Sequence, residues 1–411
     1  MQDNEKKPAL RFKGFTDPWE QRKLGELSRS FEYGLNAAAK EYDGQNKYLR
    51  ITDIDDTSRQ FVSADITSPD ANLAEADNYR LSDGDVLFAR TGASVGKTYL
   101  YKKSDGLVYF AGFLIRAKIK ESVSAGFIFQ NTLTRSYERY IAITSQRSGQ
   151  PGVNAQEYAE YQLMLPELFE QEKIAKLLEA LDILITLHQR KYEKLVNIKK
   201  SMLDKMFPKN GASVPEIRFK GFTDLWEQRK LGEIAVFSKG VGYSKNDLCE
   251  EGTPIILYGR LYTKYETCIF DVDTFVKEKA GGVYSKGGEV IVPASGEMAE
   301  DISIASVVVK PGILLGGDLN IVSPTAEYDS AFLALTISSG ATHKYLSSLA
   351  QGKSVVHLHN ADIQSVSAKF PTKREQEKIH LLFRKIDTLI TLHQREHIKS
   401  ILEVKRVKRN E

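Results

Sequence analysis

The residues whose types and spacing most directly suggest chemistry form the loop Gly92-Ala93-Ser94-Val95-Gly96-Lys97-Thr98. A phosphate-binding loop reads G-x4-G-K-[ST], in which backbone N–H groups and the lysine hold the phosphates. This loop is one residue short of that pattern, and the matching place in the second half of the chain reads Gly296-Glu297-Met298. We therefore favour a structural turn, or a loop whose side chains reach DNA phosphates or base edges, over nucleotide binding.

Polar side chains suited to DNA contact gather in two loops of the first half. The loop that follows the apolar run 84–89 offers Arg90, Thr91, Ser94 and Lys97. The second loop offers Gln146, Arg147, Ser148, Gln150 and Asn154. Arg pairs bidentately with guanine, and Gln or Asn with adenine. A solvated polar loop is the other interpretation of the second group.

The second half carries its own candidates for DNA contact, namely Tyr243, Lys245, Tyr258, Arg260, Ser295, Lys353, Ser354, His357, His359 and Asn360. His357 and His359 are separated by one residue, which could suggest a metal, but no obvious carboxylate or thiolate ligand accompanies them. We expect a DNA contact or a solvated loop there, and no metal site.

Charge is distributed unevenly along the chain, although the net charge is only +3. Lys and Arg against Asp and Glu number 16 to 17 over residues 28–165, 11 to 15 over 235–370, and 7 to 2 over 188–210. The basic excess, which includes Lys191 and Lys199, is either a solvated face or a surface toward DNA phosphates or acidic partners. Two neutral to acidic segments therefore flank a basic connection.

The composition is that of a globular protein of more than one domain. The chain has 411 residues, 42% of them hydrophobic and 27% charged. No signal-peptide pattern or long uncharged apolar run is found, so we expect a cytoplasmic protein. Cys249 and Cys268 have no metal-ligand spacing and are expected to be reduced thiols.

A tandem repeat organises these residues. PALRFKGFTDPWEQRKLGEL at 8–27 recurs at 215–234 with 16 of 20 positions identical, and QEKIAKLLEALDILITLHQR at 171–190 recurs at 376–395 with 13 of 20. The segments between these borders have diverged to a skeleton. Gly84-Asp85-Val86-Leu87-Phe88 matches Gly288-Glu289-Val290-Ile291-Val292, and each predicts a buried strand that runs into a Gly-containing loop.

The second border of each half has helical periodicity. Apolar residues spaced alternately by three and four predict a coiled-coil seam through Ile174, Leu177, Leu181, Leu184 and His188, and through Leu382, Ile386, Leu389 and His393. A helix from near Leu168 to Phe207 would span roughly 60 Å, so it should pair with its twin. His188 and His393 are interpreted as polar seam residues that fix register or contact a partner, because a seam supplies no pocket for acid–base work.

This order of parts resembles the specificity subunit of type I restriction-modification enzymes. The resemblance rests on the WEQRKLGEL borders, the GDVLFARTGASVGKT stretch, and the P-x4-EQEKI helix starts at Pro166 and Pro371. It implies an α+β chain with two mixed target recognition domains and two long helices that form an antiparallel coiled coil with pseudo-two-fold symmetry. The expected boundaries are 1–166 and 211–370 for the domains, and 167–210 and 371–411 for the helical spacers.

The resemblance also implies a non-catalytic subunit. Each recognition domain would read one half of a bipartite, asymmetric target in double-stranded DNA. The helices would dock two modification (methyltransferase) subunits, with restriction (motor and nuclease) subunits completing the complex. An NPPY-like adenine-binding tetrapeptide and a glycine-rich cofactor loop are both missing, so we expect no cofactor.

Two other classes of function were weighed. A protein-interaction scaffold would have variable domains that bind proteins, and polar and basic clusters on one face of each domain would argue against it. A fused nuclease and methyltransferase is disfavoured by the missing motifs. Because phosphate attraction normally supplies most of the affinity for DNA, the neutral to acidic recognition segments predict weak binding by the isolated chain.

Overall fold

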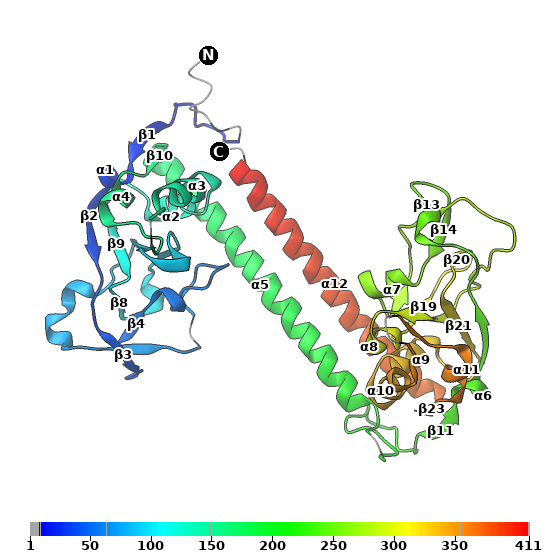
Figure 1. The fold of residues 1–411 in the computed structure, drawn as a ribbon. Helices are drawn as coiled ribbons and strands as arrows, with labels where there is room; N and C mark the ends of the chain where they lie inside the picture. The colour runs from blue at the N-terminus through cyan, green and yellow to red at the C-terminus, as the bar shows by residue number, and fades with distance from the viewer. Residues whose placement is uncertain are drawn as a thin grey trace. The chain divides into compact units, whose positions relative to one another are not determined.

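The fold is described from a computed structural model that covers residues 8, 10–62, 64–147, 149–209, 211–352 and 355–409, with the side chains of 300 and 405–409 left aside. The chain divides into two units (Figure 1). One comprises residues 1–188 with 396–411, and the other comprises residues 189–395. Each unit contains one variable segment together with part of both long helices.

The first unit is built on a four-stranded antiparallel sheet. Its order is β2 (Ser28–Tyr33), β9 (Leu114–Ile119), β6 (Asp85–Ala89) and β7 (Thr98–Leu100). The smaller pairs are β1 (Glu20–Lys23) with β10 (Gln162–Leu165), β3 (Ala38–Glu41) with β5 (Thr67–Asp70), and β4 (Lys47–Leu49) with β8 (Val108–Phe110). The short helices are α1 (Leu24–Leu27), α2 (Ala125–Asn131), α3 (Arg135–Thr144) and α4 (Ala155–Ala159). Every residue of β6 is buried, as the apolar run predicted.

The second unit repeats this plan with additions. Its main sheet runs β12 (Ala235–Lys239), β21 (Leu319–Pro324), β17 (Glu289–Pro293), β19 (Ser306–Val308) and β15 (Cys268–Ile269). A second sheet runs β13 (Leu248–Cys249), β16 (Phe275–Val276), β14 (Thr253–Ile256) and β20 (Leu314–Leu315). The pairs are β18 (Ser295–Gly296) with β22 (Val356–His357), and β11 (Glu227–Lys230) with β23 (Ser367–Phe370). The helices are α6 (Leu231–Ile234), α7 (Gly259–Thr263), α8 (Ala299–Ile302), α9 (Ser330–Ile337), α10 (Gly340–Leu349) and α11 (Asn360–Ser365).

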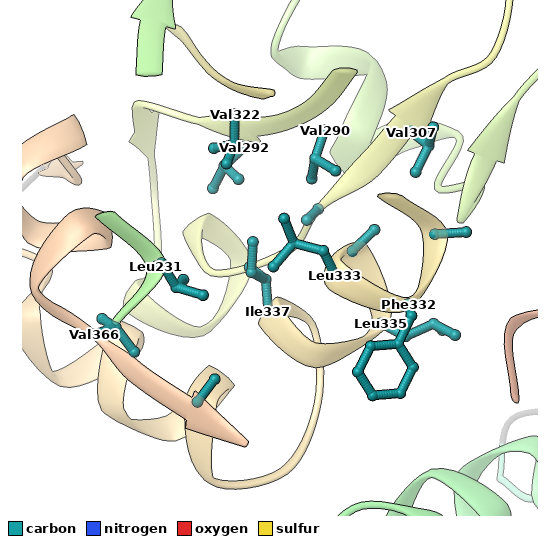
Figure 2. Close-up of a cluster of buried hydrophobic side chains, with 14 of the residues drawn as sticks. Leu231, Val290, Val292, Val307, Val322, Phe332, Leu333, Leu335, Ile337 and Val366 are labelled. Carbon is teal, nitrogen blue, oxygen red and sulfur yellow. The ribbon is translucent and has the colours of Figure 1, made fainter. Parts of the chain in front are cut away.

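The core of the second unit forms where α9 packs on the main sheet. All residues from 331 to 337 are buried, so this helix is apolar on every side, as expected of a helix that is enclosed by protein. Figure 2 shows Leu333 and Ile337 of α9 pointing toward Val290 and Val292 of β17. Asp329 caps the helix by accepting a hydrogen bond from the backbone N–H of Phe332 at 2.7 Å.

The predicted helices are present as α5 (Leu168–Met206, 39 residues) and α12 (Lys373–Arg409, 37 residues) (Figure 1). Within the second unit their segments run antiparallel. Lys199 pairs with Asp387 at 2.5 Å, and the rings of Phe207 and Phe383 lie 6.4 Å apart, so residue numbers rise along α5 as they fall along α12. Among the described helices, none carries an apolar stretch long enough to cross a membrane.

The buried stripe of each helix follows the predicted seam only in part. Leu177, Leu184 and Leu389 are 40%, 44% and 43% exposed, whereas Leu178 and Phe383 are buried. The other predicted seam residues are buried or half-buried, namely Ile174, Leu181, His188, Leu382, Ile386 and His393. The prediction assumed that each helix packs only on its twin. Each helix also packs into a domain core, through Ala175 of α5 and through Ile379 and Phe383 of α12.

A buried ion pair clasps each repeated border to its helix. In the first unit Arg11 donates to both carboxylate oxygens of Glu170, at 2.9 and 2.6 Å, and that carboxylate is fully buried. In the second unit Arg218 donates to both oxygens of Glu375, each at 2.7 Å, and Glu375 is likewise fully buried. Two parallel N–H···O bonds give such a pair a fixed geometry. We call these two pairs the clasps.

Breaking a clasp should be costly. Glu375→Gln leaves the Arg218 guanidinium without its partner charge in a buried site, which typically costs about 3–5 kcal/mol. Thermal unfolding followed by circular dichroism should show a loss of several degrees in the transition of the second unit.

The matched control is Glu227→Gln, which breaks the ion pair with Arg229. Both of those side chains are about half exposed or more, so about 0–1 kcal/mol is expected. Equal shifts for the two variants would contradict a structural role for the clasp.

Candidate nucleic-acid interface

The two predicted contact loops of the first unit lie side by side. The backbone N–H of Val153 donates to the carbonyl of Arg90 at 2.9 Å, and that of Gly92 donates to the carbonyl of Pro151 at 3.0 Å. Arg90 is held from the other side as well, because its own N–H donates to the carbonyl of Phe113 at 3.0 Å. The loop after β6, the turn before β9 and the loop before α4 therefore meet at one end of the sheet.

Several predicted side chains face outward at this end. Thr91 and Arg90 are half-buried, and Gln146, Gln150 and Asn154 are exposed. The Arg90 guanidinium carbon lies 4.9 Å from the centroid of the Tyr33 ring, a cation–π arrangement. The carboxamide of Asn154 is partly engaged, because it caps α4 by accepting the N–H of Glu157 at 2.9 Å.

The loop that resembles a phosphate-binding sequence is a turn between two strands. It leads from β6 into β7, whereas a phosphate loop opens a helix. Gly96 has φ of 84°, and a Cβ there would lie 2.6 Å from Ile141. Lys97 is 7% exposed, and its ammonium donates to the carbonyl of Ile54 at 3.0 Å and pairs with Asp56 at 2.5 Å. Lys97 is therefore a structural residue and is not part of the candidate interface.

Two other candidates of the first unit are partly engaged in the fold. Ser94 is half-buried in the short turn 92–94. Arg147 donates to the carbonyls of Thr144 and Gln146 and pairs with Glu157, which neutralises much of its charge. Ser148 lies outside the described residues, as do Lys353 and Ser354 of the second unit.

The same scaffold recurs at the equivalent end of the second unit. The N–H of Leu358 donates to the carbonyl of Ala294 at 3.0 Å, as the N–H of Val153 does to Arg90. Outside this backbone frame, His357 and His359 are exposed, with nearly parallel rings whose centroids are 6.4 Å apart. Asn360 is half-buried and donates to the carbonyl of Ser238 at 2.9 Å.

Three candidates of the second unit are buried, which sequence reasoning did not anticipate. Ser295 is 7% exposed and shares a hydrogen bond with the Nδ1 of His357 at 3.1 Å. Tyr243 is 6% exposed, and its hydroxyl accepts the N–H of Lys279 at 2.7 Å. Arg260 is 8% exposed because it forms internal ion pairs.

The partners of Arg260 are Asp273 at 2.6 Å and Glu266 at 2.8 Å, so its charge is already balanced. Ser295, Tyr243 and Arg260 are therefore buried in this structure and are not part of the candidate interface. Lys245 and Tyr258 remain on the surface.

Two aromatic residues were missed from sequence. Tyr33 is 45% exposed and Phe113 is 63% exposed, and both flank Arg90. The sequence feature that could have indicated them is Gly34, which directly follows Tyr33 and passes close to Ala111, two residues before Phe113. A Cβ on Gly34 would lie 2.1 Å from the carbonyl oxygen of Ala111, so the two chain segments pass too closely for any other residue.

The two cysteines are free thiols, as predicted. Burial raises the pKa of the Cys268 thiol to about 11, so it is protonated and unreactive at neutral pH.

Both halves of the chain match one family of known proteins. Residues 16–197 and 223–403 each match the family described as Type I restriction modification DNA specificity domain. The chain belongs to this family. The duplicated match covers both units and most of both long helices.

Relatives of similar length match the chain over most of its sequence. The chain is 22% identical over 394 residues to the type I restriction enzyme MjaVIII specificity subunit of Methanocaldococcus jannaschii, covering 92% of this chain and 88% of that one. A putative MjaX specificity subunit from the same organism is 24% identical over 408 residues, with 92% and 89% covered. The type I S subunit of M. genitalium has the same fold, with a TM-score of 0.65 at 13% identity and 98% of both chains covered.

Proposed function

We propose that the chain reads a bipartite, asymmetric DNA target, with one half-site per recognition domain, and docks the modification and restriction subunits without being catalytic itself. One observation supports this proposal above the others. The same two backbone hydrogen bonds hold Arg90 in the first domain and Ala294 in the second, while the side chains at these equivalent places differ. Identical readers would favour a symmetric target. Different readers on one frame suit a target with two unlike halves.

The two long helices expose the same apolar residues at equivalent positions, which supports docking of a partner that is present in two copies. Leu184 and Leu187 of α5 are 44% and 47% exposed, and their counterparts Leu389 and Leu392 of α12 are 43% and 49% exposed. Exposed leucines are not required by the core of either unit. Their repetition within the shared LITLHQR sequence offers the same apolar pair once per helix, which suits two modification subunits.

The function is tested by expressing the chain with its modification and restriction partners in a host that lacks such a system. Mapping methylated adenines in that host should return one motif with two unlike halves and a fixed gap. The purified chain alone should neither methylate nor cleave DNA. A cytoplasmic location follows from this proposal, because the target is cellular DNA.

DNA affinity should depend on the modification subunits. Both recognition segments are neutral to acidic, and Arg147 and Arg260 are neutralised by internal carboxylates, so little phosphate attraction remains. Titration of labelled target DNA should show weak binding by the chain alone and much tighter, salt-sensitive binding once modification subunits are added. Equal affinity in both titrations would rule this out.

The docking surface is tested by replacing its exposed leucines with arginine. Leu184→Arg with Leu187→Arg should remove one of two bound modification subunits, and adding Leu389→Arg and Leu392→Arg should remove both. Native mass spectrometry measures the stoichiometry.

Val236→Arg is the matched control, because Val236 is 71% exposed on β12 and lies outside both helices. Retention of two partners by the fourfold variant would place the docking surface elsewhere.

The length of the long helices should determine the gap between the two half-sites. Four residues inserted in α5 before Phe207 add about 6 Å of helix, close to two base steps. The methylation map should show a longer gap with both half-sites unchanged. Insertion of the same four residues in the exposed loop at 277–280 is the control, and an unchanged gap in the α5 variant would refute this prediction.

A further inference from the structure

Three scaffold positions carry different chemistry in the two recognition domains. The first is the last residue of β2 or β12, each followed by a glycine that nearly touches the opposite backbone. A Cβ on Gly34 would lie 2.1 Å from the carbonyl oxygen of Ala111, and one on Gly240 would lie 1.9 Å from that of Gly316. Tyr33 in the first domain is thus equivalent to Lys239 in the second.

The other two positions are joined by the same hydrogen bond in both domains. The N–H of Arg90 donates to the carbonyl of Phe113 at 3.0 Å, and the N–H of Ala294 donates to that of Asp318 at 2.8 Å. Phe113 and Asp318 each immediately precede the equivalent strands β9 and β21. The set is therefore Tyr, Arg and Phe in the first domain, and Lys, Ala and Asp in the second.

The first set faces an open depression. Its volume is about 590 Å³, and its lining includes Tyr33, Arg50, Arg90 and Phe113, with no Asp or Glu among the described residues that line it. Arg50 is neutralised by Asp53 at 2.8 Å. In a segment with more acidic than basic residues, the depression is thus locally basic and walled by aromatic rings.

Arg90 is the residue in this depression whose backbone and side chain are already held in one conformation. Its backbone is fixed on both sides, and its guanidinium lies over the Tyr33 ring, with no carboxylate partner among the described residues. A guanidinium that is held on a ring keeps its N–H donors in a fixed plane. Little side-chain freedom is then lost on binding, which favours a bidentate contact.

We infer that Arg90 reads a guanine in the half-site of the first domain, oriented by Tyr33 and flanked by an apolar contact from Phe113. Arg paired with the O6 and N7 of guanine in the major groove is the commonest specific contact to DNA. Ala294 is 5% exposed and offers no such donor, so this reading belongs to the first domain alone. The inference rests on the proposed function and names the base class that one domain selects.

The experiment uses the full chain in complex with its modification subunits. Competition binding against DNA with one half-site randomised at a time gives the base preference at each position. Arg90→Ala should lower the preference for guanine at one position of one half-site by roughly 5- to 150-fold. Arg90→Lys, which keeps the charge but not the planar fork, should lower it less. The other half-site should be read as before.

The ring under Arg90 gives a second, independent comparison. Tyr33→Phe keeps the ring and loses only the hydroxyl, which accepts the N–H of Ala155 at 3.3 Å, so guanine preference should be retained. Tyr33→Leu removes the platform, and guanine preference should fall in the same direction as in Arg90→Ala. Phe113→Ala should weaken selectivity at a neighbouring position of the same half-site.

Arg29→Ala is the matched control, because Arg29 is an exposed arginine near the other end of β2, paired with Glu121 at 2.6 Å. It should leave both half-sites unchanged. Unaltered guanine preference in folded Arg90→Ala, or altered reading of both half-sites, would overturn the inference while the proposed function stands. If the unaltered complex has no base preference at all, the proposed function fails and the inference with it.

Discussion

The clasps are the interaction on which the rest of each unit depends. Glu170 and Glu375 are fully buried on the first turns of α5 and α12, and a buried carboxylate is tolerated only when its charge and lone pairs are satisfied. The arginine comes from the repeated border about 157 to 159 residues away in sequence.

The glutamine next to each buried glutamate adds two further hydrogen bonds at the same place. Gln171 accepts the N–H of Ser124 and donates to Pro166, while Gln376 does the same between Asp329 and Pro371. Border, helix and domain are thereby tied at one place in each unit.

This joint explains why the borders stay alike while the domains between them diverge. A domain interior tolerates many apolar combinations as long as its volume and pattern are kept. An ion pair whose carboxylate is fully buried tolerates the loss of either partner poorly, because the remaining charge would be left unpaired. The first domain therefore packs around aromatic residues such as Phe88 and Tyr158, and the second around valines, isoleucines and α9. Both use the same clasp, so each presents its sheet end to solvent on the same backbone frame.

Much of this architecture was predictable from the sequence, because repeats and periodicity are local signals. The buried strands at 85–89 and 289–293 and both long helices were predicted from apolar runs and spacing. The candidate site was less predictable, because exposure depends on partners distant in sequence. Lys97 is enclosed by Ile54 and Asp56, more than 40 residues away, and nothing in its own loop reveals this. The helix seam was predicted only in part for a similar reason, because each helix also packs into a domain core formed by residues distant in sequence, whereas Leu177, Leu184 and Leu389 are exposed.

The arginines of the chain separate into those that hold the fold and those left for function. Four arginines are largely buried and each is paired with one or more carboxylates, so their charge is balanced inside the protein: Arg11, Arg116, Arg218 and Arg260. Each unit therefore has fewer cations free for general, sequence-independent attraction to phosphate. Selectivity between base pairs does not require that attraction, because it depends on a few well-placed donors. Neutral recognition segments are therefore compatible with the proposed function, in which discrimination between bases depends on a few donors rather than on general attraction to phosphate.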